Sequence, residues 1–221
     1  GASAGVAVSG YGSKDVGPEA LLRMADLAVY SAKLDPTENI AVYDEELDRR
    51  LTHQRSLESA LTAALHASGD ELRLVFQPIV RAVDGAVHGV EALLRWSPPG
   101  RAAVPPDVFI PIAERSDLIL DVDHWVIGHA LRHMERWPST GATEELTVSV
   151  NVSGRSLLDR TFVDRVTSLL AVSDVAASRL QIEVTETALV SDLDLAADQL
   201  AELRALGVRV VIDDFGTGYT S

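Results

Sequence analysis

Oxygen-bearing polar side chains stand at or near the ends of four apolar, strand-like runs of this sequence. Glu91 lies in AVHGVEALLRW, Asn151 in LTVSVNVS and Glu183 in LQIEVTET, while Asp213 and Asp214 end the run VRVVIDD. Parallel strands bring their carboxyl ends to one edge of a sheet, where α/β proteins build their sites. We therefore expect these residues, distant in sequence, to converge on one site.

Carboxylates gathered in one place repel one another, and burying them without partners is costly. A hard divalent cation removes that cost, and an all-oxygen ligand set favours Mg²⁺, Mn²⁺ or Ca²⁺. Asp213 and Asp214 are adjacent, so their side chains would point to different sides and could ligate two neighbouring ions. Two ions about 3.5–4 Å apart are an established arrangement for phosphodiester hydrolysis. A single acid at a strand end is more often solvated or a helix cap, but four coincident strand ends weaken that alternative.

Composition narrows the classes of protein that fit. The chain of 221 residues is 47% hydrophobic, enough for a globular core, and its net charge is −14. This charge argues against binding DNA, RNA or an anionic membrane surface, each of which needs a basic face. The absence of cysteine excludes disulfides, thiolate metal sites and cysteine nucleophiles. No apolar run approaches the roughly 20 residues of a membrane span, and no signal peptide is recognisable.

The elements that must position these residues follow from hydrophobic periodicity. We expect a strand in residues 1–9, a helix from Pro18, a short strand over Asn39–Tyr43 and one long helix over 44–67. From Glu71 onward, two apolar runs joined by Asp84-Gly85 predict a hairpin. Strand–helix units then follow and predict a parallel sheet. The helices of this part are expected at 106–114, 122–137, 162–172 and 195–206.

The repeat length is compatible with two architectures. Asn151 and Glu183 are 32 positions apart, and Glu183 and Asp213 are 30 apart. A (β/α)₈ barrel has about 31 residues per unit, but doubly wound sheets use units of similar length. The period alone therefore leaves both architectures open.

Two weaker patterns are assigned to packing. His129 and His133 stand four apart on an expected helix, but no third zinc ligand accompanies them, so we expect a packed or solvated face. Trp96, Trp125 and Trp137 are expected in the core or at its rim, although Trp96 follows Arg95 and could lie near a ligand.

Six strings in fixed order resemble the EAL-domain cyclic di-GMP phosphodiesterases over residues 71–221. They are FQPIV, GVEALLRW, FIPIAE, SVNVS, IEVTE and DDFGTGYTS. The resemblance implies a TIM-like (β/α)₈ barrel that hydrolyses cyclic di-GMP to linear pGpG with two Mg²⁺ or Mn²⁺ ions. It also implies a homodimer formed through this domain.

The resemblance also implies roles for single residues. Arg95 would contact the substrate phosphodiester, Gln77 would line the nucleotide pocket, and Glu186 would anchor the loop Phe215–Ser221. Glu91, Asp213 and Asp214 would be catalytic. The metal ligands would be Glu91, Asn151, Glu183, Asp213 and Asp214.

The flanking segments resemble further parts of such proteins. Residues 1–43, with SAGVAV and MADLAVYSAK, resemble the end of a GGDEF (diguanylate cyclase) domain without its catalytic loop, so no cyclase activity is expected. Residues 44–67 would be the connecting helix, and residues 68–221 an EAL-like domain lacking its last strands. The family's general-base lysine, a further glutamate and a glutamine would follow Ser221, so we expect a fragment of a longer protein.

Two functions follow as expectations. The first is a metal-dependent cyclic di-GMP phosphodiesterase, with the parent protein hydrolysing the nucleotide in the cytoplasm. The second is a catalytically inactive EAL-like module that binds cyclic di-GMP or a protein partner in signalling. No direct membrane contact is expected from this segment.

Overall fold

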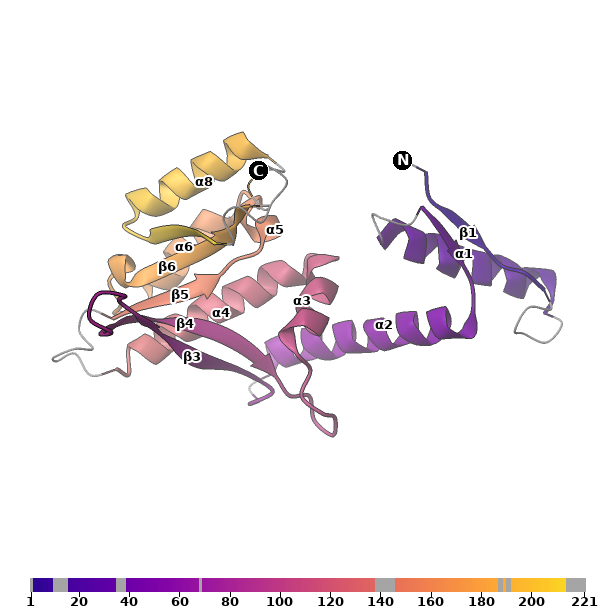
Figure 1. Cartoon of the computed structure of the whole chain (residues 1–221), viewed down its shortest axis with the longest axis horizontal. Helices are drawn as coiled ribbons and strands as arrows, with labels where there is room; N and C mark the ends of the chain where they lie inside the picture. The colour runs from indigo at the N-terminus through magenta and orange to yellow at the C-terminus, as the bar shows by residue number, and fades with distance from the viewer. Residues whose placement is uncertain are drawn as a thin grey trace. The chain divides into compact units, whose positions relative to one another are not determined.

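The computed structural model describes residues 2–9, 16–34, 39–67, 69–137, 146–186, 189 and 192–213 (Figure 1). The chain divides into two compact units, Gly1–Leu61 and Thr62–Ser221. Among the described residues, no helix combines the length and the apolar character needed to cross a membrane.

The first unit is a small α/β structure. Strands β1 (Ala4–Val6) and β2 (Ile40–Val42) pair in parallel, and helix α1 (Pro18–Leu34) connects them. Helix α2 (Glu45–His66) follows and continues past the boundary between the units. The expected strands and both helices are therefore confirmed. The core of this unit consists of Ala28, Leu47 and Leu51, with Leu27, Ala41 and Tyr43 packed against it.

Leu22 of α1 is apolar but does not belong to the buried face of the helix. Its side chain is 65% exposed. The buried face of the helix is centred on Ala28 and Ala32, which are 0% and 3% exposed. Leu22 precedes Ala28 by six residues, which rotates it about 120° away from that face.

Gly5 of β1 lies directly against the backbone of helix α1. A Cβ atom at Gly5 would collide with the backbone at Val29 N and Ala25 O, and backbone atoms cannot rotate away. We expect Gly5→Ala to destabilise the unit by about 1–3 kcal/mol, the usual range for overpacking. Gly17→Ala is the matched control, because a Cβ there meets nothing within 4 Å. Faster amide hydrogen exchange in α1 for Gly5→Ala alone would confirm the prediction, and equal exchange would contradict it.

The second unit contains a five-stranded sheet with the strand order β3-β4-β5-β6-β7. Strand β3 is antiparallel to β4, and all later neighbours are parallel. The strands are β3 (Leu72–Val80), β4 (Val87–Trp96), β5 (Thr147–Asn151), β6 (Leu180–Thr185) and β7 (Arg209–Asp213). The helices are α3 (Pro106–Glu114), α4 (Leu118–Met134), α5 (Gly154–Leu157), α6 (Phe162–Ala171), the 3₁₀ turn η2 (Ala177–Arg179) and α8 (Leu193–Ala205).

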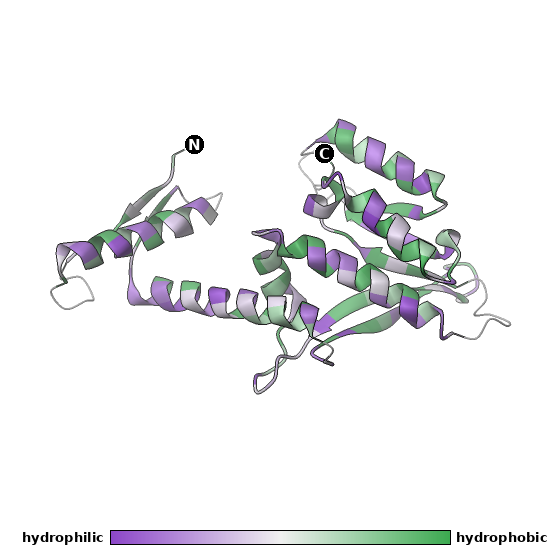
Figure 2. Ribbon diagram, turned by 180° about the vertical axis from the view of Figure 1, so that it is seen from behind, coloured by the Kyte–Doolittle hydropathy of each residue, from purple (hydrophilic) through white to green (hydrophobic). Residues whose placement is uncertain are grey.

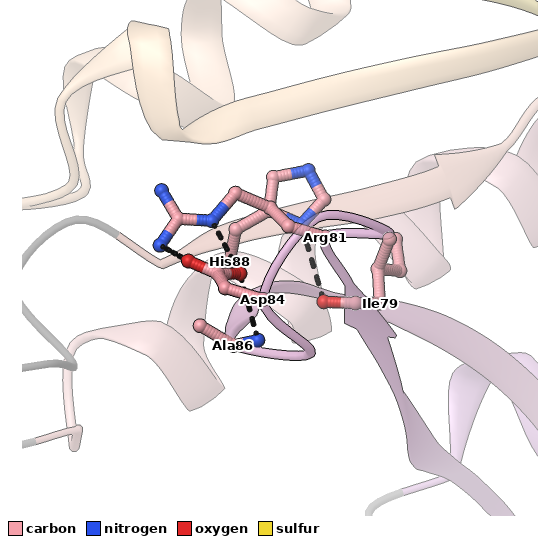
Figure 3. A network of polar contacts seen from close by, with 5 residues as sticks. All are labelled: Ile79, Arg81, Asp84, Ala86 and His88. Carbon is pink, nitrogen blue, oxygen red and sulfur yellow. Dashed lines mark hydrogen bonds and ion pairs between the residues drawn. The ribbon is translucent and has the colours of Figure 1, made fainter.

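The predicted hairpin between β3 and β4 is confirmed (Figure 3). Arg81 and Asp84 form an ion pair across its loop, with Nη2 and Oδ2 2.9 Å apart, and Asp84 Oδ1 accepts the amide of Ala86. Gly85 has φ +69°, a conformation that favours glycine. His88 is an extra residue in the ladder, and its Nδ1 lies 3.1 Å from the carbonyl oxygen of Ile79. The loop therefore fixes the register of β4.

The two faces of the sheet differ sharply in chemistry. Most even-numbered side chains of β3 to β6 face the core, except near the β3–β4 loop, where Pro78, Val80 and His88 are exposed. Helices α4 and α6 cover this face of the sheet (Figures 1 and 2). Trp96 is 1% exposed and makes an edge-to-face contact with Phe109 of α3, so the assignment of Trp96 to the core is confirmed. The buried even-numbered residues are Leu72, Leu74, Ala92, Leu94, Trp96, Val148, Val150, Leu180, Ile182 and Val184.

The fold class agrees with the expectation of alternating strands and helices around a largely parallel sheet. Gly207, with φ +92°, follows α8 and ends it as predicted. The described strands of the second unit form one sheet, and its closure into a barrel stays a prediction.

Candidate metal and substrate site on the polar face of the sheet

The odd-numbered positions of the strands carry the residues singled out in the sequence. Residues directly opposite each other in neighbouring strands point to the same face. Gln77 is opposite Glu91, Asn151 is opposite Glu183, and Asp213 is opposite Thr185. The described site residues therefore share the face of the sheet opposite to the core, and their convergence on one metal site stays a prediction.

Glu91 and Asn151 are in direct contact. The Asn151 carboxamide Nδ2 donates to Glu91 Oε1 at 2.8 Å, across 60 residues of sequence. An ionised carboxylate only accepts hydrogen bonds, so the carboxylate determines which end of the amide faces it. The hydrogen bond from Val152 N to Glu183 O, 2.9 Å long, extends the pairing of β5 with β6 past Asn151. The ends of β5 and β6 are thereby hydrogen-bonded to each other beside the site.

Glu183 is held by a residue of its own strand. Gln181 Nε2 donates to Glu183 Oε1 at 3.0 Å and to the Ser149 hydroxyl oxygen at 2.7 Å. Both site carboxylates thus accept a hydrogen bond from a neutral amide, and each remains half-exposed. Neither carboxylate is neutralised by these neutral partners.

The donor set fits a hard cation in its chemistry. Glu91, Asn151, Glu183 and Asp213 supply oxygen atoms on an accessible face, which is the ligand type that Mg²⁺ and Mn²⁺ prefer. Within the described ranges, no three histidine, cysteine or acidic side chains gather closely enough to hold an ion by themselves. Asp214 and the loop Phe215–Ser221 lie outside the described residues. Glu186 follows β6 and is half-buried.

Arginines provide positive charge at the end of the same face. Arg95 lies on β4 four residues beyond Glu91, and its Nη1 donates to the Leu94 carbonyl at 2.8 Å. Arg73 of β3 is directly opposite Arg95. Neither guanidinium forms an ion pair with an acid in the described part of the chain. Like charges opposite each other are unfavourable, and an anionic ligand would relieve that repulsion.

A buried acid supports the turn that follows Asn151. Asp123 of α4 is 5% exposed, and its Oδ2 accepts hydrogen bonds from the Ser153 amide at 2.9 Å and from the Ser153 hydroxyl at 2.8 Å. The same Ser153 hydroxyl oxygen caps α5 by accepting from Ser156 N at 3.1 Å. Helix α4 therefore holds the β5–α5 connection, only two residues from Asn151.

The pKa of Asp123 is raised to about 6, mainly by burial and to a smaller extent by the charge of Glu114. The hydrogen bonds from Ser153 oppose this shift. Ser156 also favours the ionised form, although its hydroxyl makes no hydrogen bond of regular geometry. Desolvation outweighs these contacts.

His129 and His133 of α4 are accounted for by packing. His129 stacks on Trp125, with ring centroids 3.5 Å apart, and His133 makes a T-shaped contact with Phe76, with ring centroids 5.2 Å apart. Burial lowers the pKa of both imidazoles, which keeps them neutral at pH 7. The expectation of a packed face is therefore confirmed.

Comparison with known proteins identifies the family of this chain. The EAL domain family matches residues 55–221. The chain is 38% identical over 219 residues to the cyclic di-GMP phosphodiesterase NbdA of Pseudomonas aeruginosa, covering 99% of this chain and 28% of that protein. It is 34% identical over 219 residues to the bifunctional diguanylate cyclase/cyclic di-GMP phosphodiesterase MucR of the same organism, covering 99% of this chain and 32% of that protein.

A solved structure shows the same fold. The structure of the PaMucR phosphodiesterase in complex with c-di-GMP has a TM-score of 0.67 and 37% identity, covering 76% of this chain and 65% of that chain. The protein therefore belongs to the EAL domain family. Its chain spans about a third or less of the length of these two curated relatives.

Proposed function

We propose that the protein hydrolyses cyclic di-GMP to linear pGpG with two divalent metal ions. One observation carries the proposal: the contact of Glu91 with Asn151, beside Glu183, on an accessible sheet face. The relatives named as cyclic di-GMP phosphodiesterases and the structure with bound c-di-GMP support the choice of substrate.

The residues on this face would have separate roles in metal binding and in substrate binding. The metal ions would be held by Glu91, Asn151, Glu183, Asp213 and Asp214. When bound, such ions supply an activated water and neutralise charge on the phosphodiester. Arg95 binds a phosphodiester oxygen, because a guanidinium offers paired donors to such a group. Gln77, directly opposite Glu91, lines the nucleotide pocket.

The proposal is tested by following conversion of cyclic di-GMP to pGpG chromatographically with the full-length protein. We expect turnover with Mn²⁺ or Mg²⁺, loss of turnover with a chelator, and recovery when the metal is restored. Binding of the nucleotide without turnover would instead identify an inactive EAL-like module. Absence of both binding and turnover would leave contact with a protein partner as the function.

The N-terminal segment extends the proposal. We infer that residues 1–43 are the end of a GGDEF domain and that residues 44–67 connect it to the EAL domain. The match to MucR, a bifunctional cyclase and phosphodiesterase, includes 99% of this chain and supports this organisation. Homodimerisation through the EAL domain and a cytoplasmic location belong to the same proposal. Light scattering of the full-length protein tests the dimer.

A further inference from the structure

The carboxamide of Gln181 lies between a buried hydroxyl and a site carboxylate. Its Nε2 is 2.7 Å from Ser149 Oγ and 3.0 Å from Glu183 Oε1. Gln181 is directly opposite Ser149, and Glu183 follows two positions along β6 on the same face. One amide group thus connects β5 to the carboxylate on β6.

The orientation of this amide is determined by its partners. An ionised Glu183 can only accept, so the Gln181 nitrogen must face it, whereas the Ser149 hydroxyl can act as donor or acceptor. Reversing the amide would place two oxygens against each other at Glu183. The carboxylate, more than the serine, therefore determines which end of the amide faces Glu183.

The simpler role for Gln181 is to satisfy Ser149. Ser149 is 0% exposed, and buried hydroxyls need a hydrogen-bond partner. This role explains one of the two hydrogen bonds. It does not explain the other, because Glu183 is half-exposed and accessible to water.

We propose that Gln181 is a positioning residue that fixes the Glu183 carboxylate for metal binding. This inference rests on the proposed function, in which Glu183 is a metal ligand. A carboxylate held at Oε1 keeps fewer orientations, so less freedom is lost when an ion binds. Outer-shell partners of this kind typically contribute 10–100-fold in metal affinity or activity.

The test measures Mn²⁺ affinity by calorimetry on the full-length protein without nucleotide. Gln181→Met keeps the length of the side chain but removes the donor, and we expect it to weaken Mn²⁺ binding by about 10–100-fold. Gln199→Met is the matched control, because Gln199 is 5% exposed and donates to the Asp159 carbonyl at 2.9 Å, outside the site. Ser149→Ala removes the other partner of Gln181. The unfolding midpoint of each variant is recorded in parallel.

The outcomes separate the positioning role from the simpler one. Weakened Mn²⁺ binding in Gln181→Met, with Gln199→Met and Ser149→Ala close to wild type, supports the proposal. Unchanged affinity in Gln181→Met, while Glu183→Ala loses binding, overturns the positioning role and leaves the proposed function intact. An equal loss in Gln181→Met and Ser149→Ala also overturns it, because the pairing of the two buried groups would then be the cause. If Glu183→Ala binds normally, the ligand assignment itself fails.

Discussion

Replacing Glu91 by glutamine is expected to reduce hydrolysis of cyclic di-GMP by at least about 100-fold, beyond the usual range for an outer-shell partner. Glutamine preserves the shape of the side chain and can still accept the hydrogen bond that Asn151 donates to Glu91. Only the negative charge is removed, so the fold should persist while an ion loses a charged ligand. The measurement is kcat with saturating Mn²⁺, together with the unfolding midpoint.

The control for this variant is Glu202→Gln, which removes a charge from the exposed surface of α8. This variant should keep wild-type activity, which excludes a general effect of net charge. If Glu91→Gln retains full turnover, the assignment of Glu91 as a metal ligand is wrong. A fall in both activity and unfolding midpoint would instead assign Glu91 a structural role.

Asp123→Asn should change the pH dependence of stability more than any other single charge removal described above. The pKa of Asp123 is raised from 3.8 to about 6 in the folded protein. Ionising Asp123 in the folded protein therefore lowers the free energy of unfolding. This cost is absent near pH 4 and complete above pH 6. The cost is about 3 kcal/mol, from about 1.4 kcal/mol for each pKa unit. Relative to wild type, Asp123→Asn should therefore gain about that much stability between pH 4 and pH 7.

This prediction is measured by urea unfolding with tryptophan fluorescence. Trp96, Trp125 and Trp137 all lie in the second unit, so the signal reports the unit that contains Asp123. Asp159→Asn is the matched control with the opposite sign, because hydrogen bonds from Thr161 lower the pKa of Asp159. That variant should lose relative stability as the pH rises. A stability difference between Asp123→Asn and wild type that is constant with pH would contradict the raised pKa.

The secondary structure was largely predictable because the apolar period changes clearly between strands and helices. Where an observed helix boundary differs from the predicted one, packing and charge at the end of the helix explain the difference. Helix α4 was expected from residue 122, but it begins at Leu118. Ile119 is 1% exposed and belongs to the packed face, and Asp121 in the first turn suits the positive end of the helix dipole. Packing and end charge together extend the helix toward its N-terminus.

The site was predictable in its residue types but not in its connections. Asn151 and Glu183 could be found because each stands late in an apolar run. The expectation of a strand end is wrong for Glu91, which lies in the middle of β4 because that strand continues to Trp96. Asp123 and Gln181 were missed, because their partners lie 30 and 32 residues away and depend on tertiary packing. Both had a usable signal. Asp123 is a charge on the apolar face of α4, and Gln181 shares a strand face with Glu183.

The alternation of the two faces along each strand has a consequence for the evolution of such proteins. The buried even positions of these strands form the core. The site residues Glu91, Arg95, Asn151, Glu183 and Asp213 occupy odd positions. Selection for a stable fold therefore acts mainly on the even positions, and selection for the activity of the site acts mainly on the odd positions between them. A lineage can exchange its odd positions and take up another task without rebuilding the core. A single-residue deletion within a strand, in contrast, exchanges the two faces and removes both properties at once.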